Sequence, residues 1–247
     1  MSSATNDPHE CSSSNNDSDD DEYMTRHAVR ADRERHWKPL PGRARDDTEL
    51  STAGTFAAQQ LATRLQHVRL AHIVSSPFYR CLQTVTPIAA AKGLSIKVEP
   101  GLCEVLTTFP PGFWDTPRFL AAADIGSDND EKIPIDLTYR PVMTRQDLQP
   151  EFHDGQAAHR ALRNFTTVKP PIALQLRVQL DGPILLCGHG ASCLGMAQAF
   201  GAQGYVGYTS ISQFHKDQNG GAWQVVQFGD VSHLDEELQR QALDSAW

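Results

Sequence analysis

Two histidines lie beside glycines or arginines in segments far apart in the chain. His27 lies in Arg26-His27-Ala28-Val29-Arg30, and His189 lies in Gly188-His189-Gly190-Ala191. A neutral imidazole can attack phosphorus, whereas an arginine binds a phosphate dianion well because its planar guanidinium bonds two oxygens at once and stays charged. Phosphoryl transfer through a phosphohistidine needs both groups. The sequence therefore predicts this chemistry if the fold brings the two segments together.

The nucleophile and the proton donor of such a reaction can be assigned to particular residues. His27 is the candidate nucleophile, because neighbouring cations hold an imidazole neutral at neutral pH. The leaving oxygen needs a proton, which Glu104 can deliver as a general acid. Glu99, in the same strand-and-turn segment, is the weaker alternative.

The elements that must position these residues are predicted to alternate between strands and helices. Longer helix-like stretches separate most of the strand candidates, which favours an α/β fold with a mostly parallel central sheet. The strand candidates are Tyr23 to Thr25, Ala71 to Ser75, Leu94 to Val98, Pro183 to Gly188 and Ala222 to Phe228.

Three of these strands end in polar residues. Arg26-His27 follows the first, Ser75-Ser76-Pro77 leads from the second to Arg80, and Gly188-His189-Gly190 ends the fourth. In open parallel sheets ligands collect beyond the carboxyl ends of the strands. We therefore expect these three segments to form one site.

Two helices are predicted near the first strands. The stretch from Thr55 to Gln66 places Ala57, Leu61 and Leu65 on one face, which is an amphipathic helix pattern. A second helix is expected after Pro77 and toward Gly93. Pro87 lies inside that pattern, so the helix is expected to be kinked or to start late.

A proline-rich stretch separates the third and fourth strands. Residues 105–150 have little periodicity, which suits a long excursion over one edge of the sheet that covers the active site and selects the substrate. A helix from about Gln156 to Thr167 is expected next, ended by Pro170-Pro171.

The first 22 residues differ from the rest of the chain. They contain seven acidic residues and no Lys or Arg, so we expect residues 1–22 to be a disordered acidic tail and residues 23–247 to form one catalytic domain. The chain's net charge is -8, and this tail carries all but one unit of it. Residues 23–247 are therefore nearly neutral and have no overall positive field that would attract nucleic acid. Because Asp20-Asp21-Glu22 precede Tyr23, the first strand is expected to be short or frayed.

Composition also indicates the cellular compartment of the protein. The five cysteines form no C-x-x-C pair and are odd in number, and no apolar segment opens the chain, so we expect free thiols and a cytoplasmic protein. No run approaches the roughly 18 to 20 apolar residues that cross a bilayer, so no membrane partner is expected. His67 and His72 lack further ligands nearby, and no metal site is expected there.

The ordered motifs resemble those of the histidine phosphatase (phosphoglycerate mutase-like) superfamily. The resemblance is carried by residues 26–32, residues 75–84 and Gly188-His189-Gly190-Ala191, in order and spacing. Within that superfamily the chain looks most like the phosphatase domain of the suppressor of T-cell receptor signalling proteins and the ecdysteroid-phosphate phosphatases. Residues 98–104, residues 135–141 and Trp247 carry this narrower likeness.

The resemblance implies a three-layer α/β/α fold and a phosphatase that acts through phosphohistidine. It implies phosphotyrosine or another aryl or bulky phosphate as substrate, on a small molecule or a phosphoprotein, a possible homodimer, and no metal or organic cofactor. The implied catalytic residues are His27, Glu104 and His189, and the implied phosphate-binding residues are Arg26, Arg30, Arg80 and His189.

The chain departs from the superfamily motif at two positions. The motif has Gly after the nucleophilic histidine and Glu before the second arginine, whereas this chain has Ala28 and Val29. The Ala28 methyl group is expected to crowd the phosphate. These departures and the polar first strand motivate one alternative, a catalytically weak or inactive interaction protein that keeps the fold. A separate alternative is a phosphoglycerate-type mutase, which returns the phosphoryl group to a sugar acid, and the narrower likeness argues against it.

Overall fold

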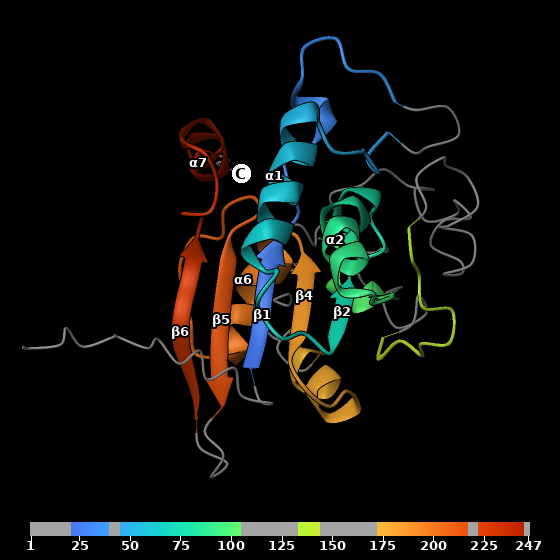
Figure 1. Cartoon of the computed structure of the whole chain (residues 1–247), viewed down its shortest axis with the longest axis vertical. Coiled ribbons are helices and arrows are strands. Elements are labelled where there is room, and N and C mark those ends of the chain that lie inside the picture. Colours follow the sequence, from blue (N-terminus) through green and yellow to red (C-terminus); the bar gives the residue numbers. More distant parts are fainter. Residues whose placement is uncertain (1–20, 40–44, 105–132, 144–171, 217–221, 245–247) are drawn as a thin grey trace, which may run out of the picture.

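Six strands form one mixed sheet in the computed structural model, which describes residues 21–39, 45–104, 133–143, 172–216 and 222–244. The strand order is β3-β2-β4-β1-β5-β6 (Figure 1). The strands are β1 (Asp21–Arg26), β2 (His72–Ser75), β3 (Ile96–Val98), β4 (Ile184–Gly188), β5 (Ile211–Lys216) and β6 (Trp223–Asp230).

The four strands β3, β2, β4 and β1 run parallel, so their carboxyl ends lie at one edge of the sheet. In this register Arg26 lies opposite Gly188, and Ser75 lies opposite Cys187. β5 and β6 extend the sheet beyond β1 as an antiparallel pair. The chain therefore leaves β1, β2 and β4 at adjacent points, as the sequence predicted for these three segments.

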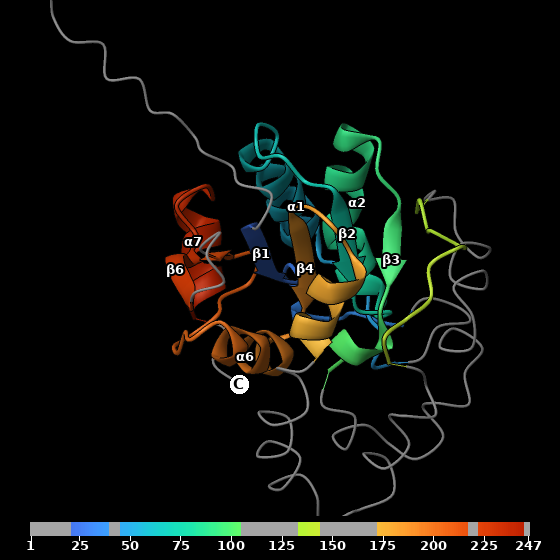
Figure 2. The ribbon, with the colours of Figure 1, turned by 90° about the horizontal axis from the view of Figure 1, so that it is seen from below.

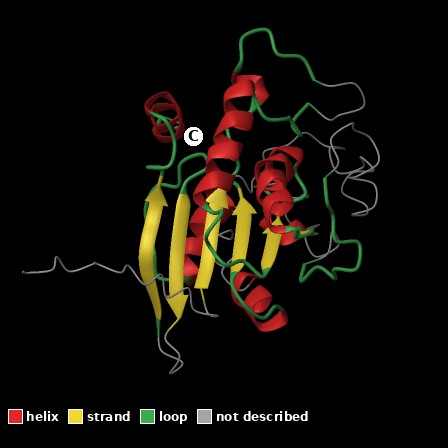
Figure 3. Cartoon of the chain, viewed as in Figure 1, coloured by secondary structure: helices red, strands yellow, loops and turns green. Residues whose placement is uncertain are grey.

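Helices cover both faces of the sheet (Figures 2 and 3). α1 (Thr52–Arg64) and α2 (Tyr79–Lys92) lie on one face, and α6 (Gly190–Ala199) lies on the other with a helical segment at 172–179. α7 (Glu236–Leu243) packs against α1. The predicted three-layer α/β/α fold is confirmed. In the described part of the chain, no helix has the length and apolar character needed to span a membrane.

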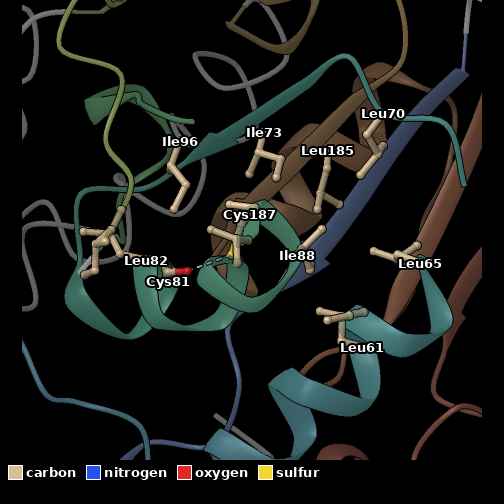
Figure 4. Packing of buried hydrophobic residues seen from close by; sticks show 14 of the residues in the cluster. Leu61, Leu65, Leu70, Ile73, Cys81, Leu82, Ile88, Ile96, Leu185 and Cys187 are labelled. Carbon is tan, nitrogen blue, oxygen red and sulfur yellow. Dashed lines mark hydrogen bonds between the residues drawn. The ribbon is translucent and has the colours of Figure 1, made fainter. Parts of the chain in front are cut away.

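Strand side chains alternate between two hydrophobic clusters. Ile73, Leu185 and Cys187 point toward α1 and α2, as Figure 4 shows. Their neighbours Val74 and Leu186 belong to the cluster beneath α6. Because both faces of the central strands are buried, these strands are apolar along most of their length, which is why β2 and β4 were predicted within one or two residues.

The expectation of a short first strand was wrong. β1 begins at Asp21, and both Asp21 and Glu22 are buried residues of the sheet rather than part of the acidic tail. Asp21 Oδ1 lies 2.8 Å from His215 Nδ1, and Glu22 Oε1 lies 3.7 Å from Arg177 Nε. The His215 ring in β5 and the Arg177 guanidinium in the 172–179 helix lie beside these carboxylates, which compensates their burial within the strand.

Tertiary contacts explain one corrected prediction, the start of α2, and one strand that was not predicted, β5. α2 does not start late: it begins at Tyr79, whose backbone N–H donates to Asp47 Oδ1 at 2.7 Å, and it continues through Pro87. β5 was not predicted, because a register shift between Ile211 and Phe214 breaks the regular alternation of a strand. The helix expected at Gln156 to Thr167, and most of residues 105–150, lie outside the described residues.

Candidate active site

The two histidines lie next to each other beyond the carboxyl ends of β1 and β4. His27 follows β1 directly, and His189 is the residue before the first turn of α6. Their ring centroids are 5.1 Å apart with an angle of 63° between the planes. Both side chains are buried. This separation is small enough for one phosphoryl group to contact both rings.

Arg80 connects the two rings. It lies in the first turn of α2 and is fully buried. Its Nε donates to His27 Nε2 at 3.3 Å, and its Nη2 donates to His189 Nδ1 at 3.1 Å. Its Nη1 donates to the Asp46 carbonyl oxygen at 3.1 Å. The guanidinium is thus held in one orientation between the two imidazoles.

The hydrogen bonds of His27 determine which of its nitrogens carries the proton. Nδ1 lies 2.8 Å from the carbonyl oxygen of Ala28, which can only accept, so Nδ1 carries the hydrogen. Nε2 then has the lone pair, which accepts from Arg80. A phosphate that takes over the N–H donors of Arg80 would free this lone pair for attack.

Both histidines are held neutral. Burial is the main cause that lowers the pKa of His27 well below its ordinary value, and the positive charges of Arg80 and Arg26 lower it further. Burial and Arg80 likewise lower the pKa of His189 well below its ordinary value. Neutral imidazoles surrounded by guanidiniums are the state that a nucleophilic histidine requires.

Arg26 lies on the other side of His27, held by an aromatic ring. Its Cζ lies 4.1 Å from the centroid of the Tyr208 ring, and its Nη1 donates to the Val206 carbonyl oxygen at 3.1 Å. The Tyr208 ring is also 5.3 Å from the His27 ring. A Cβ at Gly190 would lie 3.3 Å from Arg26 Cζ, so the glycine leaves room for the guanidinium beside α6. No local pattern in the sequence indicates Tyr208, because it lies far along the chain from Arg26 and His27.

Arg30 is placed differently from Arg26 and Arg80. Its Nε donates to Asp32 Oδ1 at 2.9 Å and its Nη2 to Asp32 Oδ2, which makes a two-point ion pair. Its charge still contributes to lowering the pKa of both histidines. To bind phosphate, Arg30 would have to share its donors with this carboxylate.

The two candidate acids have different surroundings. Glu104 Oε2 lies 3.7 Å from His189 Nδ1, and its side chain is 24% exposed, so it faces the site and also reaches solvent. Glu99 is fully buried and accepts from Tyr139 Oη at 2.8 Å and from the backbone N–H of Gly101, Val142 and Met143. Glu99 therefore fastens residues 139–143 to the end of β3, and the weaker alternative for the proton donor is not favoured.

Comparison with known proteins shows which protein family this chain resembles. The model of the histidine phosphatase superfamily (branch 1) matches residues 23–107. Ecdysteroid-phosphate phosphatase of Drosophila melanogaster is 29% identical over 160 residues, which cover 62% of this chain and 19% of that protein. Residues 23–107 thus resemble the histidine phosphatase superfamily. It spans about a fifth of the length of the curated relatives it matches.

Other known proteins are also similar to this chain. Ubiquitin-associated and SH3 domain-containing protein A of Mus musculus is 31% identical over 115 residues, which cover 42% of this chain and 17% of that protein. The ecdysone phosphate phosphatase of Bombyx mori, solved with tungstate, has a TM-score of 0.55 at 19% identity and covers 84% of this chain and 92% of that one. Phosphoserine phosphatase of Entamoeba histolytica has a TM-score of 0.53, also at 19% identity, and covers 87% and 98% of the two chains. These two structures share the fold.

The two departures from the superfamily motif have different environments. Ala28 is fully buried, and it belongs to an apolar cluster with Leu50 and Ala57, while its N–H donates to Thr84 Oγ1 at 2.9 Å. The methyl group therefore packs in this cluster, and the expectation that it crowds the phosphate is not supported. Val29 packs against the same cluster.

A hollow of about 460 Å³ adjoins this part of the candidate site. It lies between the loop that follows His27 and the helices α1 and α7, and Val29, Ala53 and Tyr208 contribute apolar lining. Polar and charged residues line it as well, namely Ser51, Gln241, Arg33, Glu34 and Asp244. Tyr208 lines the hollow and its ring centroid lies 5.3 Å from that of His27, so the hollow and the nucleophile candidate share one aromatic neighbour.

The neutral histidines predict a loss of stability in acid. On unfolding, both rings regain a pKa near 6.5, so below that pH the unfolded chain binds protons that the folded chain does not. Each histidine should lower the free energy of unfolding by up to about 1.4 kcal/mol per pH unit as the pH falls from 6.5. Urea unfolding at pH 7.5, 6.5 and 5.5 measures this, and His27→Asn should make the fall less steep. An equal slope in both proteins would contradict the neutral state of His27.

Proposed function

We propose that this chain is a phosphomonoester hydrolase that acts through a phosphohistidine on His27. The observation that carries the proposal is the pair of neutral imidazoles 5.1 Å apart, joined by the buried Arg80. The match of residues 23–107 to the histidine phosphatase superfamily and the similarity to ecdysteroid-phosphate phosphatases support the same reaction class. Because the chain covers 19% of the curated relative from Drosophila melanogaster, its activity needs a direct test.

The first proposed step transfers the phosphoryl group to the protein. Arg26, Arg80 and His189 bind the phosphate oxygens, with Arg30 joining them by sharing its donors with Asp32. The Nε2 lone pair of His27 forms a bond to phosphorus as the bond from phosphorus to the leaving oxygen breaks. Glu104 gives that oxygen a proton, so the product leaves as a neutral alcohol or phenol.

The second proposed step regenerates the free site. Glu104, now ionised, takes a proton from a water molecule whose oxygen attacks phosphorus. The bond between phosphorus and His27 Nε2 breaks, and inorganic phosphate is released. The nitrogen recovers its lone pair, so protons and electrons balance over the cycle.

Hydrolysis of p-nitrophenyl phosphate by the purified chain tests the proposal, together with trapping of an acid-labile phosphoprotein. Hydrolysis with phosphate covalently bound to histidine is the expected result. Absence of both signals would instead favour the non-catalytic interaction protein. Rapid interconversion of phosphoglycerates without net release of phosphate would favour the mutase, for which the described residues give no specific support.

We further propose that the organic part of the substrate is an aryl or other bulky apolar group that enters the hollow beyond Tyr208. Apolar side chains suit such a group, and Val29 places no charge where the superfamily motif has a glutamate. The relatives named for ecdysteroid phosphates agree with a bulky leaving group.

An Ala53→Phe substitution should test this location by filling the hollow from α1. We expect the KM for a bulky aryl phosphate to rise about tenfold, since a lost apolar contact of this size is worth about 1 to 3 kcal/mol. Inhibition by inorganic phosphate should not change, because phosphate does not enter the hollow. The matched control is Ala91→Phe on the exposed face of α2. An unchanged KM in Ala53→Phe would place the leaving group elsewhere.

A further inference from the structure

Ser76 contacts a catalytic candidate but was not among the predicted site residues. It directly follows β2 and is fully buried. Its Oγ lies 2.8 Å from Nε2 of His189, on the side of the ring away from Arg80. Cys81 also contacts this nitrogen, with its Sγ 3.5 Å from Nε2. Ser76 is thus the closest polar partner of Nε2.

The donors around His189 determine where its proton lies in the free protein. Arg80 Nη2 can only donate, so Nδ1 of His189 must accept and carry a lone pair. Glu104 Oε2 faces the same nitrogen at 3.7 Å, which is beyond hydrogen-bond distance. Burial and the nearby arginines keep the ring neutral, so its single proton lies on Nε2. Nε2–H then donates to Ser76 Oγ. The thiol of Cys81 is directed to the Gly188 carbonyl oxygen at 3.6 Å and offers only a weak acceptor.

Phosphate changes what faces Nδ1. A phosphomonoester dianion presents only acceptor oxygens, and inorganic phosphate dianion presents three unprotonated oxygens beside its single hydroxyl; either competes with the ring for the donors of Arg80. An oxygen that meets the Nδ1 lone pair would be repelled, whereas an Nδ1–H would attract it. The negative charge of the phosphate also favours a positive imidazolium beside it. Phosphate binding is therefore coupled to proton uptake at Nδ1.

We propose that Ser76 is a positioning residue for phosphate binding: its Oγ keeps one proton of His189 on Nε2, so that Nδ1 is the atom that gains a proton and donates it to phosphate. The added proton comes from the phosphate monoanion, which enters as the acid and remains as the dianion. The ring becomes an imidazolium that is hydrogen-bonded at both nitrogens. This inference rests on the proposed function only in requiring that the site binds phosphate.

Nuclear magnetic resonance of the ring nitrogens tests the proposal on the wild-type chain. Free protein should show one protonated nitrogen on His189, Nε2. Addition of inorganic phosphate should protonate Nδ1 while Nε2–H remains. Loss of the Nε2 proton in the phosphate complex, or no response of His189 to millimolar phosphate, would overturn the proposal.

A Ser76→Ala variant adds a second readout. We expect its dissociation constant for inorganic phosphate to rise about tenfold or more, because a hydrogen bond to a charged group contributes more than one between neutral groups. The Nδ1 proton signal should weaken as well. Ser75→Ala is the matched control, since Ser75 is an adjacent, equally buried serine whose Oγ donates to the Ser76 carbonyl oxygen at 3.0 Å.

The outcomes separate this inference from the proposed function. Wild-type behaviour of Ser76→Ala in both phosphate affinity and ring protonation would overturn the role of Ser76, even if the chain hydrolyses phosphomonoesters. Normal ring protonation in a chain that hydrolyses none would overturn the proposed function and support the role of Ser76. A merely structural role of Ser76 would change stability without changing the protonation of His189.

Discussion

A His27→Asn variant is expected to lose p-nitrophenyl phosphate hydrolysis by at least about 10⁴-fold. Removing a nucleophile eliminates the covalent route entirely, and what remains is the smaller effect of binding and charge stabilisation. Asparagine has no lone pair on its side-chain nitrogen that can attack phosphorus, but its amide can still occupy much of the space of the ring. The variant should also fail to form the acid-labile phosphoprotein. Steady-state rates and phosphohistidine trapping measure the two effects.

Two controls make this result specific. His72→Asn changes a histidine at the start of β2, whose Nε2 lies 3.0 Å from the Asp181 carbonyl oxygen at the amino end of the strand. It should hydrolyse substrate at the wild-type rate. Binding of inorganic phosphate by His27→Asn shows that the arginines remain in place. Hydrolysis by His27→Asn at a rate near that of the wild type would remove His27 from the proposed mechanism.

The strand ends that meet at the site were predictable because their positions follow from general sheet geometry. β2 and β4 are short apolar runs, and each is followed by polar residues. A parallel sheet places such ends at one edge, which is enough to bring His27, Arg80 and His189 into one region. The sequence therefore predicts that the site lies at the carboxyl ends of these strands.

The bonding partners inside that region were not predictable from local sequence. Which donor faces which nitrogen depends on the direction of α2 and on contacts with distant residues, as the Tyr208 ring on Arg26 illustrates. Arg30 is the same residue type as Arg80, yet it pairs with Asp32, whereas Arg80 joins two histidines. Only tertiary structure distinguishes these two arginines.

The error in the first strand has a related cause. Local composition placed Asp21 and Glu22 in the acidic tail, since isolated carboxylates are rarely buried. Their partners come from later in the chain, His215 in β5 and Arg177 in the 172–179 helix. A carboxylate that has a polar or cationic partner can lie in a central strand. β1 therefore begins earlier than its own sequence indicates, and His27 directly follows a strand of six residues.

An Arg80→Lys variant should lower kcat/KM about 10³-fold although it keeps the positive charge. Arginine presents a fixed planar set of donors, and here three of them contact His27, His189 and the Asp46 carbonyl oxygen. A lysine ammonium is a single point charge that cannot replace this geometry, and losing a buried donor to a developing charge costs about 10² to 10³ in rate. The matched control, Arg177→Lys, changes a partly buried arginine that pairs with Glu22, and it should retain activity.

The pH profile separates the geometry of Arg80 from its charge. Arg80 helps to hold the pKa of His27 below its ordinary value, so its charge extends the neutral, nucleophilic form of the ring to lower pH. Arg80→Met removes that charge and should move the acid limb of the kcat/KM profile to higher pH. Arg80→Lys keeps the charge, so its limb should stay near that of the wild type while the plateau falls. If Arg80→Lys kept the wild-type plateau, charge alone would account for the role of this residue, and the fixed hydrogen bonds between the two histidines would not matter for the reaction.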